Sequence, residues 1–155
     1  MKDIYVVSTR SAVIGSAIIG LVAGALTWGL SLVLQRYFVE PVFCHSVDSF
    51  GVCANGGTIA FNIALVVTAV AAVVALVRVE GYRPLLVAIA AVATLWSANT
   101  WLGVQSWWEA TLWLSLLSML AYLVYSWVAR ITIFPISVLL MAIIVVAGRL
   151  IVALS

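Results

Sequence analysis

The twenty residues TIAFNIALVVTAVAAVVALV, Thr58–Val77, contain no charged side chain and consist almost wholly of Ala, Val, Leu and Ile. An α-helix of about 20 residues measures about 30 Å, which is the thickness of the hydrocarbon core of a bilayer. The segment that follows, Arg78–Pro84, brings charge, Gly and Pro together, and this combination ends a helix in a short turn. The stretch therefore predicts a transmembrane helix.

Four further apolar segments of similar length lie on either side of this one. Hydrophobic residues make up 66% of the 155-residue chain and charged residues only 8%, whereas soluble domains carry about a quarter charged residues. We therefore predict an all-α polytopic membrane bundle of five helices in a single domain, or of four if the last segment lies on the membrane surface. The predicted spans are residues 11–34, 58–77, 85–104, 110–129 and 135–154.

Positive charge is distributed unevenly between the predicted loops. Cytoplasmic loops carry an excess of Lys and Arg, and placing the N-terminus inside leaves only Arg36 and Arg149 toward the outside. The loop 35–57 is then extracytoplasmic, in a cell membrane that we expect to be a prokaryotic inner membrane. The net charge of +2 is too small and scattered for nucleic-acid binding. The basic residues expected inside are Lys2, Arg10, Arg78, Arg83 and Arg130.

The loop 35–57 contains both cysteines of the chain, Cys44 and Cys53. Since disulfides persist on the oxidising side of a membrane, the pair predicts a structural disulfide bond. A redox pair is a second interpretation, with His45 beside Cys44 to lower a thiol pKa, but redox enzymes of this kind use a closer C-x-x-C pair. A zinc site that adds Asp48 is a third, although the spacing matches no recurring zinc framework.

Two amides lie inside the predicted spans. Asn62 and Asn99 each lie about one turn from the outer end of their helices, so antiparallel packing places them at similar depth. Hydrogen bonding between helices is the default role of such groups. The alternative is a polar pocket that opens to the outside and holds a small ligand or a quinone head group. Its lining would be Asn62, Thr94, Ser97, Asn99 and Gln105.

Arg149 is a charge within the last apolar segment. Ionisable residues inside spans are candidates for a functional role. The structural interpretation is that the long side chain extends to the outer head groups, or pairs with Glu109 at the outer end of the fourth helix. The functional interpretation is that Arg149 binds an anionic lipid or a partner protein.

Small residues recur on the first predicted helix. Ser16, Gly20 and Gly24 follow one another at intervals of four residues. A face of this kind lets another helix approach closely. The sequence does not distinguish a helix of this chain from a helix of another chain, so the face predicts helix packing, either internal or between subunits.

The predicted spans contain no His and, within the confident spans, no Asp or Glu. These absences argue against haem ligation, aspartyl-protease chemistry and proton relays, and we predict no cofactor or metal. We expect a non-catalytic accessory or structural subunit that binds other membrane proteins or itself and has a disulfide-pinned outer loop. A small-solute or lipid transporter or channel acting as an oligomer is the alternative, and a membrane thiol-disulfide oxidoreductase is the third interpretation.

Overall fold

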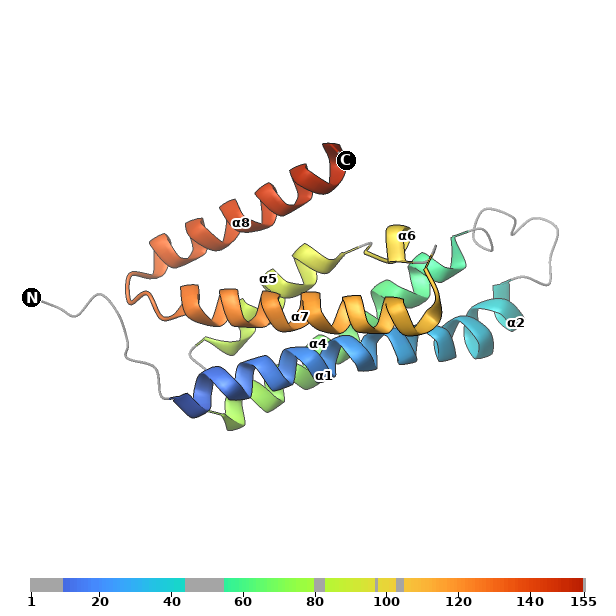
Figure 1. Ribbon diagram of the computed structural model, residues 1–155, viewed down its shortest axis with the longest axis horizontal. Helices are drawn as coiled ribbons and strands as arrows, with labels where there is room; N and C mark the ends of the chain where they lie inside the picture. The colour runs from blue at the N-terminus through green and yellow to red at the C-terminus, as the bar shows by residue number, and fades with distance from the viewer. Residues whose placement is uncertain (1–9, 44–54, 80–82, 97, 103–104, 155) are drawn as a thin grey trace, which may run out of the picture.

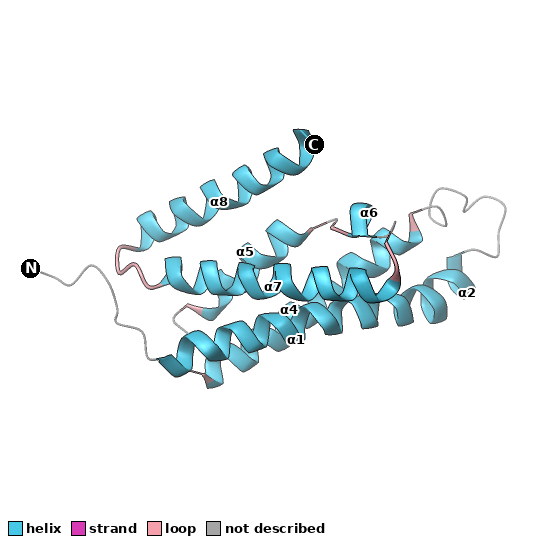
Figure 2. Cartoon of the chain, viewed as in Figure 1, coloured by secondary structure: helices cyan, strands magenta, loops and turns pink. Residues whose placement is uncertain are grey.

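A computed structural model describes residues 10–43, 55–79, 83–96, 98–102 and 105–154. The described residues are mostly helical and include no β-strand (Figure 2). The elements are α1 (Arg10–Leu34), a π-helical turn η1 (Gln35–Val39), α2 (Glu40–Phe43), α4 (Gly56–Arg78), α5 (Pro84–Leu95), α6 (Asn99–Leu102), α7 (Trp107–Ala129) and α8 (Phe134–Leu154).

Three helical segments in the described part of the chain are long and apolar enough to cross a membrane. They are Ser11–Val42, Gly56–Arg78 and Trp107–Ala129. Two further apolar helices, α5 and the segment Phe134–Leu150 of α8, are shorter. The predicted all-α membrane bundle is confirmed, and the protein is an integral membrane protein by this composition. The number of spans, the orientation and the type of membrane stay predictions.

The first helix is longer than the sequence indicated. The predicted first span ends at Leu34, and a proline such as Pro41 ordinarily disfavours helical geometry at the residue before it, Glu40. The chain instead continues through η1 into α2, and Glu40 is helical, with φ −62° and ψ −52°. In an α-helix the ring of Pro41 would press on the carbonyl four residues earlier. The π-helical turn widens the backbone just before the proline, and the Glu40 N–H reaches the carbonyl of Gln35.

The third predicted span, 85–104, is interrupted. Helix α5 begins with Pro84 at its first turn and ends at Leu95, and Trp96 is extended, with φ −58° and ψ 126°. Ser and Asn compete with the helical backbone through their side chains, and Ser97 and Asn99 follow this break. A 12-residue helix measures about 18 Å, which is shorter than the hydrocarbon core. The structure therefore has no single continuous helix over 85–104, and whether this segment crosses the membrane stays a prediction.

Four helices form the body of the molecule. Helix α1 packs against α4 and α7, and α5 packs against the same two helices. Helix α8 packs against α5 and α7, and in Figure 1 it begins beside the end of α7 and diverges from it. We call the end of the bundle where α1 and α5 begin the basal end, and the opposite end the distal end. The N-terminal start of α8 also lies at the basal end.

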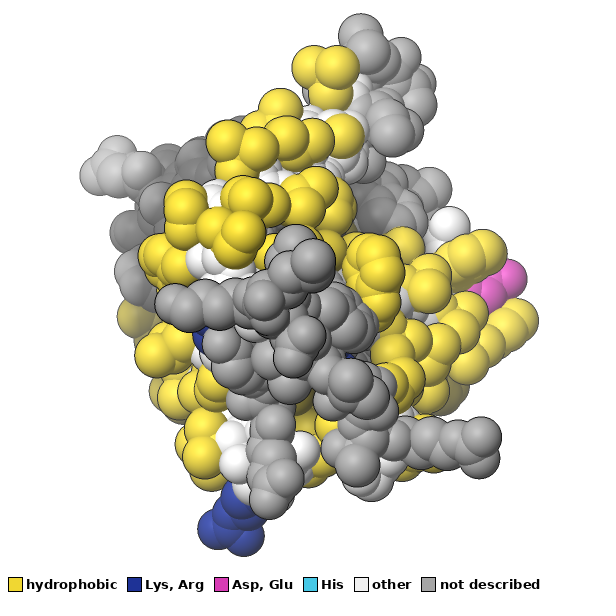
Figure 3. All heavy atoms as spheres, turned by 90° about the vertical axis from the view of Figure 1, so that its left-hand side faces the viewer, with side chains coloured by type: hydrophobic (Ala, Val, Ile, Leu, Met, Phe, Trp, Pro, Cys, Tyr) yellow, Lys and Arg dark blue, Asp and Glu magenta, His cyan; other side chains and the backbone are white. Residues whose placement is uncertain are grey.

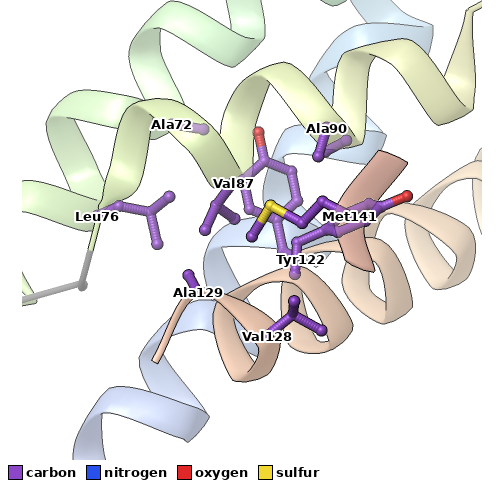
Figure 4. Close-up of a cluster of buried hydrophobic side chains, with 10 residues drawn as sticks. Ala72, Leu76, Val87, Ala90, Tyr122, Val128, Ala129 and Met141 are labelled. Carbon is purple, nitrogen blue, oxygen red and sulfur yellow. The ribbon is translucent and has the colours of Figure 1, made fainter. Parts of the chain in front are cut away.

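Two clusters of buried side chains hold these helices together. The cluster nearer the basal end joins α4, α5, α7 and α8, and Figure 4 shows Tyr122 of α7 and Met141 of α8 within it. The distal cluster centres on Trp28 of α1, whose ring meets Phe61 of α4 edge-on at a centroid distance of 6.5 Å. Tyr125, 1% exposed, is the largest fully buried side chain and belongs to the first cluster.

Candidate functional site: polar contacts between the helices

The small-residue face of α1 packs inside this chain, against α7. A Cβ added to Gly20 would lie 2.8 Å from the carbonyl oxygen of Ser118, and one added to Gly24 would lie 2.7 Å from that of Leu114. Both distances are shorter than real Cβ contacts allow. The glycines therefore set the separation of the two helices, which are in backbone contact.

Hydroxyl groups bridge the same helices and the next pair. Ser126 Oγ of α7 donates to Ser16 Oγ of α1 at 3.3 Å. Thr27 Oγ1 of α1 and Thr68 Oγ1 of α4 lie 2.6 Å apart, and both side chains are buried. Thr68 also bonds the carbonyl of Ala64 in its own helix. Hydrogen bonds of this kind between transmembrane helices each contribute about 0.6–2 kcal/mol.

The residues of the predicted polar pocket have separate surroundings. Thr94 Oγ1 bonds the hydroxyl of Tyr125 and the carbonyl of Ala90, which directs it toward α7. Asn99 Nδ2 donates to Thr58 Oγ1 at 3.1 Å, so it joins α6 to the start of α4. Asn62 is half-buried on α4 and Gln105 is exposed before α7. Ser97 lies outside the described residues. The described grooves and pockets do not gather these side chains in one lining.

Two buried polar atoms near the distal end have no hydrogen-bond partner among the described residues. They are Nε1 of Trp28, a donor, and Oδ1 of Asn99, an acceptor. Buried polar atoms usually find a protein or water partner. Trp28 belongs to the distal cluster, and Asn99 follows Ala98 of the same cluster.

Arg149 of α8 binds the broken end of α5. Its Nε donates to the carbonyl oxygen of Ala93 at 3.2 Å. The last carbonyls of a helix lack intrahelical partners and carry a partial negative charge, which a guanidinium neutralises. The pairing with Glu109 that the sequence suggested is not what the structure has. Glu109 instead accepts from the N–H and the hydroxyl of Ser106 and caps the start of α7.

A second arginine fastens α8 at the basal end. Arg83 precedes α5 in a left-handed conformation, with φ 52°. Its guanidinium donates to the carbonyls of Ile131 and Thr132, at 3.5 Å and 3.3 Å, and lies 4.9 Å from the ring centre of Phe134. One side chain thereby holds the α7–α8 turn and the first residue of α8 against the start of α5.

Replacing Arg83 by glutamine should loosen this attachment. Both hydrogen bonds are long, so we expect a loss of roughly 1.5 kcal/mol, the lower end of the range for a charged donor. Thermal unfolding in a mild detergent measures it. The matched control is Arg78→Gln, which removes the same charge from an exposed residue at the end of α4. Equal losses in the two variants would contradict the assigned role of Arg83.

The two cysteines, Cys44 and Cys53, lie outside the described residues together with His45 and Asp48. The predicted disulfide, and its redox and zinc alternatives, therefore stay predictions. In the described ranges no group of three His, Cys, Asp or Glu side chains is close enough to hold a metal ion.

Two of the surface grooves are lined by apolar residues alone. One of about 400 Å³ lies between α4 and α5, and one of about 830 Å³ runs along α8. Residues lining the first groove include Val70 and Ile89, and residues lining the second include Leu139 and Ile143. Such surfaces are what a bilayer covers with acyl chains. Comparison of the chain with protein-family models, curated proteins and solved structures gives no match.

Sequence reasoning found the Ser16, Gly20 and Gly24 face but missed the other hydroxyl contacts between the helices. Tyr125, Thr27 and Thr68 read as ordinary span residues, because a hydroxyl that bonds its own helix can sit anywhere in an apolar run. For Arg83 the sequence carried one local signal, the proline that follows it. Pro84 marks the start of α5 and so places Arg83 directly before that helix.

Proposed function

We propose that this integral membrane protein is a non-catalytic accessory or structural subunit of a membrane assembly. The supporting observation is the use of its intramembrane polar groups. From the basal to the distal end they join helices to one another, through Ser16–Ser126, Thr27–Thr68, Thr94–Tyr125 and Asn99–Thr58. This is the arrangement of a packing element, in which polar groups fix helix positions.

The small-residue face supports a narrower version of this proposal. Gly20 and Gly24 are occupied by α7 of the same chain, so they are not the surface that meets another subunit. We propose that the partner meets the segment that follows α2, on the extracytoplasmic side, and that a Cys44–Cys53 disulfide fixes its shape.

Purification from native membranes in a mild detergent, followed by intact-mass identification, tests the proposal. We expect a stoichiometric partner protein, and a mass before and after reduction and alkylation that reports one disulfide. The Cys44→Ser/Cys53→Ser variant should lose the partner while its helical bundle melts at a similar temperature. Recovery of the chain alone, or only as a homo-oligomer, would overturn the subunit proposal.

A small-solute or lipid transporter remains the second candidate, because α5 is interrupted within the predicted membrane region. Helices broken in this way often border substrate sites, and here Arg149 lies at the break with Asn99 just beyond it. Flux into proteoliposomes that is lost in Asn99→Ala and Arg149→Gln would favour this function. If flux is unchanged in both variants, the transporter function is contradicted. A thiol oxidoreductase, the third candidate, would require the two cysteines to be catalytic.

A further inference from the structure

Arg130 is a buried cation at the basal end of the bundle. It follows α7 as the C-cap residue, and its backbone N–H bonds the carbonyl of Trp127. The residue is 8% exposed. No side-chain hydrogen bond or ion pair links it to any other residue in the described ranges, in contrast to Arg83 and Arg149.

Arg130 is enclosed as a residue, but its side-chain nitrogens are not among the fully buried polar atoms without a partner, so they reach the spaces that the side chain lines. A guanidinium in this position favours an anion in the adjoining space. Removing that charge from water is costly unless an opposite charge or several acceptors replace the hydration shell. The described part of the chain supplies hydroxyls nearby, on Ser16 and Ser126, but no carboxylate.

The side chain lines two spaces, and only one of them has room for a ligand. A narrow crevice of about 10 Å³, with Ser16 and Pro84 in its wall, holds no more than a water molecule. On the other side lies a groove of about 420 Å³ between α1 and α7. Its lining is Val13, Leu123, Val124, Ser126, Trp127 and Arg130.

The groove has the character of a lipid site. Apart from Ser126 and Arg130 its walls are apolar, as an acyl chain requires. Trp127 in its lining is 65% exposed, and Trp side chains favour the level of the lipid head groups. Figure 3, which views the basal end, shows hydrophobic side chains over most of the described surface and few charged ones. A water-soluble anion would gain nothing from these walls.

We propose that this groove binds one anionic phospholipid. The guanidinium of Arg130 holds the phosphate, which accepts paired hydrogen bonds from its planar fork, and an acyl chain lies along Val13 and Val124. The site shares Ser126 with the polar contacts between the helices and does not depend on a partner subunit.

Native mass spectrometry of the full-length protein, with phosphatidylglycerol or phosphatidylcholine added, tests this site. The protein should retain one phosphatidylglycerol in preference to phosphatidylcholine. Arg130→Gln should weaken that retention by about tenfold, as expected for loss of a charge-assisted phosphate contact. The matched control is Arg78→Gln, which removes the same charge from an exposed residue at the same end and should retain the lipid.

A second variant tests the groove without changing Arg130. Val13 is 40% exposed, so a tryptophan in its place (Val13→Trp) fills the part of the groove that would hold the acyl chain and leaves Arg130 and the core unchanged. It should also release the lipid. Retention unchanged in both site variants, equal loss in Arg78→Gln and Arg130→Gln, or displacement of the lipid by inorganic phosphate would each overturn the proposal.

Discussion

Replacement of Gly24 by leucine should destabilise the bundle more than any other single change to α1. A Cβ at this position already meets the α7 backbone, with the carbonyl oxygen of Leu114 and the Cα of Ser115 both at 2.7 Å. Backbone atoms cannot rotate away as a side chain can, so α1 and α7 must separate. Overpacking of this type costs about 1–3 kcal/mol, or more where the backbone must move. Unfolding in mixed micelles with a graded fraction of denaturing detergent measures the loss.

Gly29 on the same helix provides the matched control. A Cβ added there meets no atom within 4 Å, so Gly29→Leu adds the same side chain without a clash. It should leave stability unchanged or raise it slightly, because an interior glycine disfavours a helix by about 0.5–1 kcal/mol relative to alanine. If both variants lose the same amount, α1 does not pack on α7 through Gly24.

Replacement of Tyr125 by alanine should have the largest effect among the buried side chains. The ring is 1% exposed, and the hydroxyl bonds Thr94 of α5. Removing a large buried aromatic costs about 3–5 kcal/mol in soluble proteins, through lost contacts and the cavity left behind. In a membrane most of this loss comes from van der Waals packing, because the lipid that replaces water is as apolar as the protein core. Tyr125→Phe removes only the hydroxyl and should cost about 0.6–2 kcal/mol.

The same micelle titration separates these contributions. Trp113→Ala removes an aromatic side chain from the same helix at a position that is 52% exposed, and it should change stability little. The double variant Tyr125→Phe/Thr94→Val should lose no more than Tyr125→Phe alone if the two hydroxyls bond each other. Additive losses would contradict the assigned contact, and a loss for Trp113→Ala equal to that for Tyr125→Ala would contradict the burial assignment.

Charge and apolar length predicted most of the fold. Helices α4 and α7 begin and end within about three residues of the predicted limits. The ends agree because Arg78 and Arg130 terminate apolar runs that have no internal helix breaker. The break after α5 had a local signal in the polar residues Ser97 and Asn99, which the span prediction included within one helix. The contact that Asn99 makes there, with Thr58 of α4, is a tertiary bond that the sequence does not mark. The extension through Pro41 depends on a π-helical turn, for which the sequence carries no clear signal.

The candidate site was predictable in its residue types and not in its pairings. Gly20 and Gly24 indicated a close helix contact, but only the packing identifies α7 as its other side. Arg149 was recognised as an unusual charge, and its acceptor is a backbone carbonyl, a group that every residue carries and no sequence pattern marks. For Arg130 the sequence predicted only a cytoplasmic charge, because an arginine that follows an apolar run is typical of the inner end of a span.

The contact between Arg149 and the end of α5 has a consequence for the order in which the protein is made. Arg149 lies 56 residues after Ala93 along the chain, so a ribosome that has just inserted α5 has not yet synthesised the group that caps it. Until then the Ala93 carbonyl must rely on water or on the translocation machinery. We therefore expect α5 to settle at its final depth only once α8 has been synthesised, which makes the insertion of these two helices a late and coupled step.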